Sequence, residues 1–172
     1  DYDWKGFKEG IESEWNSVKN YIEKLVSQYK IGGLITFGGS VHGTFHNLHS
    51  FQKLSNFPLF IAADYERGLG TFIDGTLFPP NMAIAATNDT LNAYEQGKII
   101  SEEARSIGVN MILAPVLDIN NNKNNPIINF RSYGDTPEVV MKYGLPFIKG
   151  VQDYGLIACA KHYPGHGNTA TD

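Results

Sequence analysis

Short, almost continuous apolar runs alternate along this sequence with longer segments of helical apolar period. The apolar runs cover residues 31–37, 58–63, 111–117 and 156–160, and the helical segments cover about residues 6–29, 44–54, 89–107 and 136–154. Nearly continuous apolar runs are typical of parallel strands that are buried on both faces. The order is one helix followed by β-α-β-α-β-α-β, which predicts an α/β fold with a parallel sheet and right-handed crossovers.

The helical segments carry their own start and stop signals. The first one repeats apolar residues at spacings of three and four, which gives one stripe: Phe7, Ile11, Trp15, Val18, Ile22, Leu25 and Tyr29. Thr136 and Pro137 are typical of an N-cap and a first helical residue. Gly108 and Gly155 directly follow the last periodic residues of two segments, where a C-terminal glycine is expected.

The lengths of the connections favour one end of the predicted sheet. Returns from helix to strand take a few residues, whereas residues 65–88 and 119–135 form connections of roughly 20 residues each, and such long loops are usually functional. Both leave the carboxyl end of a strand, where parallel α/β folds place their active sites. Four strands are half of a (β/α)8 TIM-type barrel. We therefore expect residues 1–172 to be the N-terminal part of a single barrel domain, incomplete at its C-terminus.

Composition excludes several classes of protein. The net charge is −4 and the 14 Lys and Arg residues are scattered, which argues against nucleic-acid binding. Cys159 is the only cysteine, so the chain has neither an internal disulfide framework nor a cysteine-based zinc site. No apolar run approaches the ~18 residues of a membrane span. Dinucleotide, Walker and nucleophile-elbow motifs are also missing. The compartment, cytoplasmic or exported, is not readable from these features.

Polar residues directly follow three successive predicted strands: Asp64, Asp118 and the pair Lys161 and His162. Because parallel strands end at one edge, we expect these side chains to converge there, together with Arg131 from a long loop. Asp64 and Glu66 can accept hydrogen bonds from ligand hydroxyl groups. Arg131 and Lys161 can donate hydrogen bonds, or hold the carboxylates in their ionised form.

Residues 161–172 read Lys-His-Tyr-Pro-Gly-His-Gly-Asn-Thr-Ala-Thr-Asp and hold several chemistry-bearing side chains close together. Proline and glycine impose a tight backbone path here. His162 and His166 have the spacing of two zinc ligands on a helix, but the Pro-Gly pair between them prevents a helix. Asp172 or Asp64 would have to complete such a site. A metal-dependent hydrolase stays an alternative, and our main reading has no metal and no cofactor.

The other histidines, His42, His46 and His49, fall on the second helical segment. Histidines on an exposed helical face are usually solvated, and we assign them no role.

Several segments together resemble glycoside hydrolase family three, specifically its β-N-acetylhexosaminidase branch. The string Lys-His-Tyr-Pro-Gly-His-Gly at residues 161–167 is the most specific match. Other matching segments are residues 31–35, 63–66 (Ala-Asp-Tyr-Glu), 78–82 (Phe-Pro-Pro-Asn-Met), 103–108, 114–118 (Ala-Pro-Val-Leu-Asp) and 129–134 (Asn-Phe-Arg-Ser-Tyr-Gly). The resemblance implies a (β/α)8 barrel and a small carbohydrate as partner.

The resemblance also implies roles for individual residues. Asp64, Arg131, Lys161 and His162 would bind the non-reducing-end sugar. Asp172 would be the Asp of an Asp-x-His acid/base pair, with that His and the nucleophilic Asp beyond residue 172. The implied reaction is retaining hydrolysis that releases terminal N-acetylhexosamine (GlcNAc) from β-linked glycans of chitin or peptidoglycan type.

Alternatives within and outside this family stay open. An N-acetylglucosaminide phosphorylase, a β-glucosidase and a non-catalytic sugar-binding relative are all compatible with the fold. One departure from the family pattern is Arg67, which stands before Gly68 where two glycines are usual. We expect it to alter the pocket rim on the leaving-group side.

Overall fold

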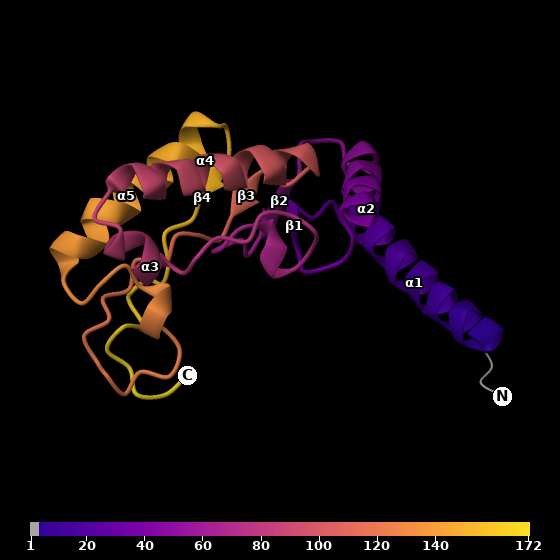
Figure 1. The fold of residues 1–172 in the computed structure, drawn as a ribbon. Helices are drawn as coiled ribbons and strands as arrows, with labels where there is room; N and C mark the ends of the chain where they lie inside the picture. Colours follow the sequence, from indigo (N-terminus) through magenta and orange to yellow (C-terminus); the bar gives the residue numbers. More distant parts are fainter. Residues whose placement is uncertain (1–3) are drawn as a thin grey trace.

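The computed structural model describes residues 4–172, with side chains from residue 12 onward. Its elements, with η marking short 3-10 helices, are α1 (Trp4–Ser27), β1 (Gly33–Thr36), α2 (Val41–Leu54), β2 (Phe60–Ala63), η1 (Leu69–Thr71), α3 (Asn81–Ala86), α4 (Thr90–Ser106), β3 (Met111–Ile112), η2 (Asn129–Arg131), α5 (Pro137–Asp153) and β4 (Ile157–Ala158). The predicted order of one helix followed by alternating strands and helices is confirmed (Figure 1).

The four strands form one parallel sheet in the order β1-β2-β3-β4. Each strand is therefore added beside the one that precedes it in the sequence. A doubly wound sheet reverses its strand order, whereas the wall of a (β/α) barrel does not. The observed order confirms the α/β prediction and is that of four successive strands of a barrel.

The strands are shorter than predicted, most clearly β3, which was expected over residues 111–117 and pairs only over Met111–Ile112. Pro115 has no N–H to donate, which interrupts the regular ladder. Pairing resumes at a bridge between Val116 and Lys161, where the N–H of Leu117 donates to the carbonyl of Lys161. These bonds keep the segments that follow β3 and β4 side by side up to the polar residues.

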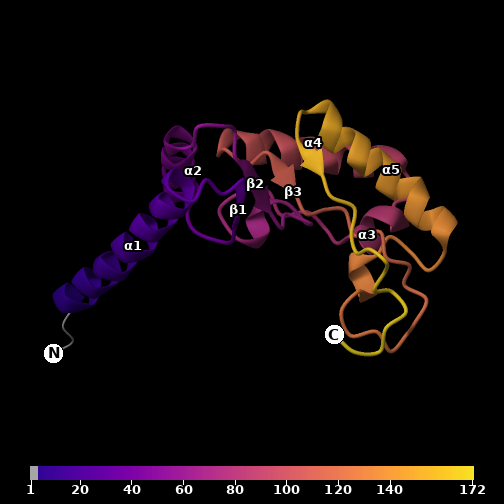
Figure 2. The ribbon, with the colours of Figure 1, turned by 180° about the vertical axis from the view of Figure 1, so that it is seen from behind.

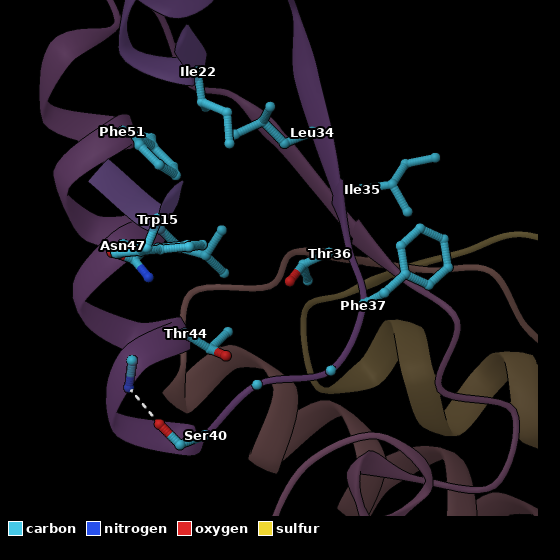
Figure 3. A pocket seen from close by; sticks show the side chains of 14 residues that line it. Trp15, Ile22, Leu34, Ile35, Thr36, Phe37, Ser40, Thr44, Asn47 and Phe51 are labelled. Atoms are coloured by element: carbon cyan, nitrogen blue, oxygen red, sulfur yellow. Dashed lines mark hydrogen bonds between the residues drawn. The ribbon is translucent and has the colours of Figure 1, made fainter. Parts of the chain in front are cut away.

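The two faces of the sheet differ in how they are covered. In β1, Leu34 and Thr36 point towards α2, whereas Ile35 and Phe37 point the other way (Figure 3). On the helix-covered face, residues such as Ile61 and Ile112 are 1% and 0% exposed. On the opposite face, three strand residues are 43–58% exposed: Ile35, Phe60 and Ile157. The sheet thus presents an open apolar face.

Helices α4 and α5 lie side by side over the covered face in both views (Figures 1 and 2). Their backbones approach closely at Gly97 and Gly150. A Cβ on Gly97 would lie 2.3 Å from the carbonyl oxygen of Phe147, and one on Gly150 would lie 2.2 Å from that of Tyr94. The contact brings Ile100 and Phe147 into the core, where both are fully buried.

Helix α1 extends away from the sheet (Figure 1), and its apolar stripe is only partly covered. Trp15 and Val18 are 45% and 50% exposed, and burial begins near the end of the helix, where Val26 is 2% exposed. Tyr29, predicted at the end of the stripe, lies beyond the helix and is 66% exposed. The other predicted stripe members, Phe7 and Ile11, lie outside the described side chains.

Capping chemistry sets most of the observed helix ends. α2 begins at Val41 rather than Thr44, because the Oγ of Ser40 accepts a hydrogen bond from the N–H of Gly43. Thr136 caps α5 as predicted, with Pro137 as its first residue. Gly108 and Gly155 have the positive φ values expected of C-terminal glycines, +94° and +80°.

The two long connections contain short helices that were not predicted. η1 and α3 lie within residues 65–88, and η2 lies within residues 119–135. The loops that follow β2, β3 and β4 gather at the end of the sheet where the C-terminus lies (Figure 2). Among the described residues, no helix combines the length and apolarity that a membrane crossing requires.

Candidate functional site

Four of the five predicted site residues come together at the carboxyl ends of the strands. Asp64 directly follows β2, and Lys161 and His162 follow β4. Arg131 reaches the same place from η2, in the loop that follows β3. The convergence follows from the parallel sheet, because all of its strands end on one side.

Ion pairs join three of these side chains, Asp64, Arg131 and Lys161, to Glu66 in one network. The guanidinium of Arg131 makes two hydrogen bonds to the carboxylate of Glu66, Nε to Oε2 at 3.0 Å and Nη2 to Oε1 at 2.5 Å. The Nζ of Lys161 lies 2.6 Å from Oε1 of Glu66 and 2.5 Å from Oδ1 of Asp64. Glu66, whose side chain is 15% exposed, is therefore the centre of the network.

The network changes the ionisation of its members. Burial alone would raise the pKa of Glu66, but the hydrogen bonds and positive charges of Arg131 and Lys161 lower it below its ordinary value. The hydrogen bond to Glu66 raises the pKa of Arg131. The predicted role of the two cations in keeping a carboxylate ionised thus applies to Glu66.

Two buried amides hold the backbone of this network. The Nδ2 of Asn81, at the start of α3, donates to the carbonyl of Arg131 at 2.8 Å. The Nε2 of Gln96, on α4, lies 3.5 Å from the carbonyl of Glu66. Asn81 and Gln96 are 3% and 1% exposed. Helices α3 and α4 therefore fix the backbone of Arg131 and Glu66 through these two side chains.

The network leaves hydrogen-bonding capacity for a ligand. Within the described side chains, Oδ2 of Asp64 accepts no hydrogen bond, and Lys161 uses two of its three N–H groups. Glu66 is different, because both of its oxygens already accept hydrogen bonds from cations. Asp64 therefore has a carboxylate oxygen without a partner among the described side chains, whereas each oxygen of Glu66 already contacts a cation.

Asp118 holds the part of the site that contains His162 and His166. Its side chain is 0% exposed, and Oδ2 lies 2.6 Å from Nδ1 of His162. Oδ2 also accepts from the N–H of His162, and Oδ1 accepts from the N–H of His166 at 2.6 Å. One carboxylate therefore holds an imidazole and the backbone of the loop that follows it.

The loop of residues 161–172 is also held by Asn125, which is 4% exposed. The Nδ2 of Asn125 donates to the carbonyl of His166 at 2.6 Å and to Oγ1 of Thr169 at 3.3 Å. Asp172 lies at the far end of this loop with a side chain 79% exposed, and its Oδ1 is 3.5 Å from Nε2 of His166. Asp172 is thus near the site but outside the ion-pair network.

The two histidines of this loop do not face one another as metal ligands on a helix would. Their rings are edge to face with centroids 5.7 Å apart. Nδ1 of His162 is bound to Asp118, and Nδ1 of His166 to Thr169 at 2.6 Å. The part of the chain that the structure describes contains no group of three His, Cys, Asp or Glu side chains placed to hold a metal ion.

Two hollows differ in their relation to these residues. One of about 280 Å³ lies between the segment that follows β3 and the loop of residues 161–172. Its lining is Leu117, Asp118, Ile119, Asn121, His162, Pro164, Gly165, Gly167 and Asn168. Another of about 300 Å³ lies between α1, α2 and β1, where Trp15, Leu34 and Phe51 point into it (Figure 3). The first hollow is lined by the predicted site residue His162 and by Asp118, whereas the second contains no predicted site residue, so the first is the candidate ligand site.

Comparison with known proteins assigns this arrangement to a family. Residues 9–172 match the family model described as glycosyl hydrolase family 3 N terminal domain. The chain belongs to glycosyl hydrolase family 3. The family resemblance noted in the sequence is thereby confirmed.

The chain is similar to several individual members of family 3. It is 38% identical over 165 residues to β-hexosaminidase A of Pseudoalteromonas piscicida, covering 88% of this chain and 28% of that protein. The structure of a family 3 β-N-acetylglucosaminidase from Paenibacillus sp. is 39% identical, with a TM-score of 0.83 over 88% of this chain and 30% of that one. A β-glucoside phosphorylase, BglX, is 32% identical, with a TM-score of 0.78 over 82% of this chain and 26% of that one.

The chain thus spans less than a third of the length of these relatives. The family match and the sequential parallel sheet together show that the described part has the fold of a family 3 barrel wall.

Arg67, the departure from the family pattern, has its described contacts within its own loop. Its Nε donates to the carbonyl of Phe78 at 3.1 Å, and its carbonyl accepts from the N–H of Phe78 at 2.8 Å. The side chain therefore ties the two ends of the loop that follows β2.

Sequence reasoning left three contributors out of the predicted site. Asp118 was recognised as a polar residue at a strand end, and Glu66 as a possible acceptor beside Asp64. Nothing in the sequence distinguished an internal anchor from a ligand-binding carboxylate. Asn125 carried no signal, because its contacts with His166 and Thr169 depend on how two loops meet. His42 and His46, to which we assigned no role, are exposed on α2, with ring centroids 4.2 Å apart.

Proposed function

We propose that the protein is a retaining glycosidase that releases terminal N-acetylhexosamine, chiefly GlcNAc, from β-linked glycans of chitin or peptidoglycan type. One observation carries the proposal: Asp64, Arg131, Lys161 and His162 converge at one edge of a family 3 sheet. Support also comes from relatives named β-hexosaminidase and β-N-acetylglucosaminidase, at 38% and 39% identity.

The proposed sugar site combines donors and acceptors. Asp64 accepts from sugar hydroxyls through Oδ2, while Arg131 and Lys161 donate to hydroxyl or acetamido oxygens. A sugar hydroxyl both donates and accepts, so a rim of mixed character holds a ring by several directed bonds. Glu66 is not a sugar ligand in this proposal, because its oxygens are occupied by the two cations.

Asp172 is proposed as the carboxylate partner of the acid/base histidine. The family resemblance assigns that histidine to the second position after Asp172, and the nucleophilic aspartate to a later strand. The nucleophile attacks the anomeric carbon while the imidazolium protonates the departing glycosidic oxygen. Water then transfers a proton to the imidazole and attacks the same carbon, which frees the sugar and the nucleophile.

We further propose that these 172 residues form the first four β-α units of a (β/α)8 barrel. The chain covers 28% of β-hexosaminidase A, and the outer edges of β1 and β4 have no strand partner among the described residues. The open apolar face with Ile35, Phe60 and Ile157 is what the interior of a barrel would bury.

The test compares hydrolysis of p-nitrophenyl β-N-acetylglucosaminide and β-glucoside by the product of the complete reading frame that contains this sequence. We expect clear preference for the N-acetyl substrate, a product of retained configuration by NMR, and an unchanged rate with a chelator. Asp172→Asn should lower kcat. Arg131→Lys should mainly raise KM, by about tenfold, because lysine cannot reproduce two guanidinium hydrogen bonds.

Other outcomes would replace the proposal. Faster cleavage of the glucoside would make the protein a β-glucosidase. Binding of GlcNAc without turnover would make it a non-catalytic relative, and loss of activity with the chelator would support a metal-dependent hydrolase.

A phosphorylase is the second candidate, because the β-glucoside phosphorylase BglX is 32% identical over this region. The same enzyme assayed with inorganic phosphate separates the two reactions. We expect free GlcNAc as the product whether or not phosphate is present. Formation of a sugar 1-phosphate in its place would assign the protein to the phosphorylases.

A further inference from the structure

Asp118 makes every contact expected of a carboxylate that orients a neighbouring group and touches no ligand itself. Asp118 borders the adjacent hollow, but its side chain is 0% exposed, so its oxygens face their donors rather than the hollow. Oδ1 accepts from the N–H of His166 at 2.6 Å, and Oδ2 accepts from the N–H of His162 at 3.2 Å. Both oxygens therefore already face a donor.

This arrangement fixes the proton on the imidazole of His162. Each oxygen of Asp118 already accepts a hydrogen bond from a backbone N–H, so the carboxylate acts as the acceptor in its contact with His162. The 2.6 Å contact between Oδ2 and Nδ1 of His162 must then carry the hydrogen on Nδ1. In the neutral imidazole, Nε2 is consequently the nitrogen with the lone pair.

Nε2 of His162 is available to a ligand. The side chain of His162 is 34% exposed and lines the hollow of about 280 Å³. Its neighbours Arg131 and Lys161 are donors that cannot accept. An acceptor at Nε2 complements these two cations, whereas a second N–H there would add another donor to a site already rich in donors.

We propose that Asp118 is a positioning residue that holds His162 in the Nδ1–H tautomer, so that neutral His162 accepts a hydrogen bond from a sugar hydroxyl at Nε2. The proposal rests on the proposed function, because it takes the ligand to be a sugar. It adds a direction to the contact: the hydroxyl donates and the imidazole accepts. Asp118 acts through His162 and does not itself touch the sugar.

The first test is the tautomer of His162, measured by ¹⁵N NMR on the full chain with labelled histidine above the ordinary histidine pKa of about 6.5. The His162→Gln variant assigns the signals. We expect hydrogen on Nδ1 and a bare Nε2 in the wild-type protein, and a shift towards Nε2–H in Asp118→Asn. The matched control is Asp153→Asn, which removes a surface carboxylate paired with Lys149, and should leave the signals unchanged.

This measurement needs no catalysis, so its failure is separate from failure of the proposed function. A predominant Nε2–H tautomer in the wild-type protein would overturn the proposal even if Asp118→Asn did not fold.

The second test reads the direction of the hydrogen bond in the product of the complete reading frame. Monodeoxy and deoxyfluoro N-acetylglucosaminides remove one hydroxyl at a time, and fluorine keeps only weak acceptor character. At the hydroxyl that contacts His162, both analogues should have a kcat/KM lower than that of the parent substrate by the same factor, up to about tenfold. This factor corresponds to the loss of one neutral hydrogen bond. A kcat/KM that is restored with the fluoro analogue would show that His162 donates the hydrogen bond, which contradicts the proposal.

A double variant tests whether Asp118 acts through His162. Asp118→Asn combined with His162→Gln should weaken kcat/KM no more than His162→Gln alone, because the group that Asp118 positions is already gone. Additive losses from the two substitutions would assign Asp118 a separate structural role and would refute the proposed one.

Discussion

Asp64 and Glu66 show how two carboxylates that contact the same lysine serve different purposes. One carboxylate oxygen of Asp64 accepts no hydrogen bond among the described side chains, whereas both oxygens of Glu66 contact Arg131 or Lys161. The difference lies in burial and in the number of cations within reach. Glu66 binds Arg131 through both oxygens, and such bidentate geometry is specific as well as strong.

At the residue scale, Glu66→Gln should lower the free energy of unfolding at pH 7 by about 2 kcal/mol, because it leaves the partly buried Arg131 without its ion-pair partner and Lys161 with Asp64 alone. The pKa of Glu66 is lowered in the folded state, so its contribution is present above the ordinary value of about 4.3. The contribution disappears as the pH falls through the lower folded-state pKa.

Chemical denaturation of wild type and Glu66→Gln between pH 7 and pH 3 measures this contribution. The wild-type protein should lose more stability on acidification than the variant does. The exposed residue Glu14 on α1 offers a control, Glu14→Gln, expected to follow the wild-type profile. Parallel pH profiles for wild type and Glu66→Gln would show that the ion pairs contribute nothing.

At the element scale, the contact of α4 with α5 depends on two glycines that let the helix backbones meet. Gly97→Ala and Gly150→Ala would each place a Cβ within 2.3 Å of a carbonyl oxygen of the other helix. Each should lower stability by about 1–3 kcal/mol, the usual cost of overpacking, despite the better helix propensity of alanine. Thermal unfolding gives the measurement.

Gly32→Ala is the matched control, because nothing lies within 4 Å of a Cβ at that position. It should leave the unfolding temperature close to that of the wild type. An increase in stability for Gly97→Ala would mean that the helices can move apart without loss, contrary to the close packing described.

The second prediction at this scale concerns the joint between two loops. Asn125 holds its own loop through Ile127 and Ile128, whose N–H groups donate to its Oδ1 at 2.8 Å and 2.7 Å. Its Nδ2 holds residues 161–172 through His166. Asn125→Ala should release both loops, because it leaves several buried backbone groups unpaired at about 1–3 kcal/mol each.

Hydrogen exchange is the measurement suited to Asn125→Ala, with faster exchange expected for residues 161–172 and little change in α4 and α5. The exposed neighbour Asn124→Ala serves as control. Unchanged exchange in Asn125→Ala would show that the loops are held by other contacts.

At the scale of the whole molecule, the sheet has one covered and one open face. Ile35, Phe60 and Ile157 are 57%, 58% and 43% exposed on the open face. Apolar surface of this kind drives association or dye binding unless another part of a protein covers it. The proposed barrel places the remaining strands over it.

We therefore predict that residues 1–172 produced alone bind a hydrophobic dye strongly, and that the product of the complete reading frame does not. Phe60→Ser should weaken the dye signal of the short form. Leu91→Ser, at a residue 58% exposed on α4, should not. Equal, low dye binding by both forms would contradict the barrel proposal.

The sequence alone predicted the elements, their order and the parallel sheet, because apolar period, caps and turn residues act within a few residues of one another. It also placed Asp64, Asp118, Lys161 and His162 at strand ends, and the structure pairs Lys161 with Asp64 and His162 with Asp118. The short helix α3 was missed although residues 81–86 are good helix formers after a proline, since the segment was assigned to a long loop.

Only the tertiary structure decided which of these polar residues form ion pairs with one another and which remain available to a ligand. Arg131 and Glu66 are 65 residues apart, and Lys161 and Asp64 are 97 apart, so their ion pairs depend on how loops from different strands meet. The same holds for burial: α1 has a regular apolar stripe, yet most of its described part extends past the sheet that would cover it. Local pattern specifies what an element is, whereas long-range packing specifies which of its groups are left for a ligand.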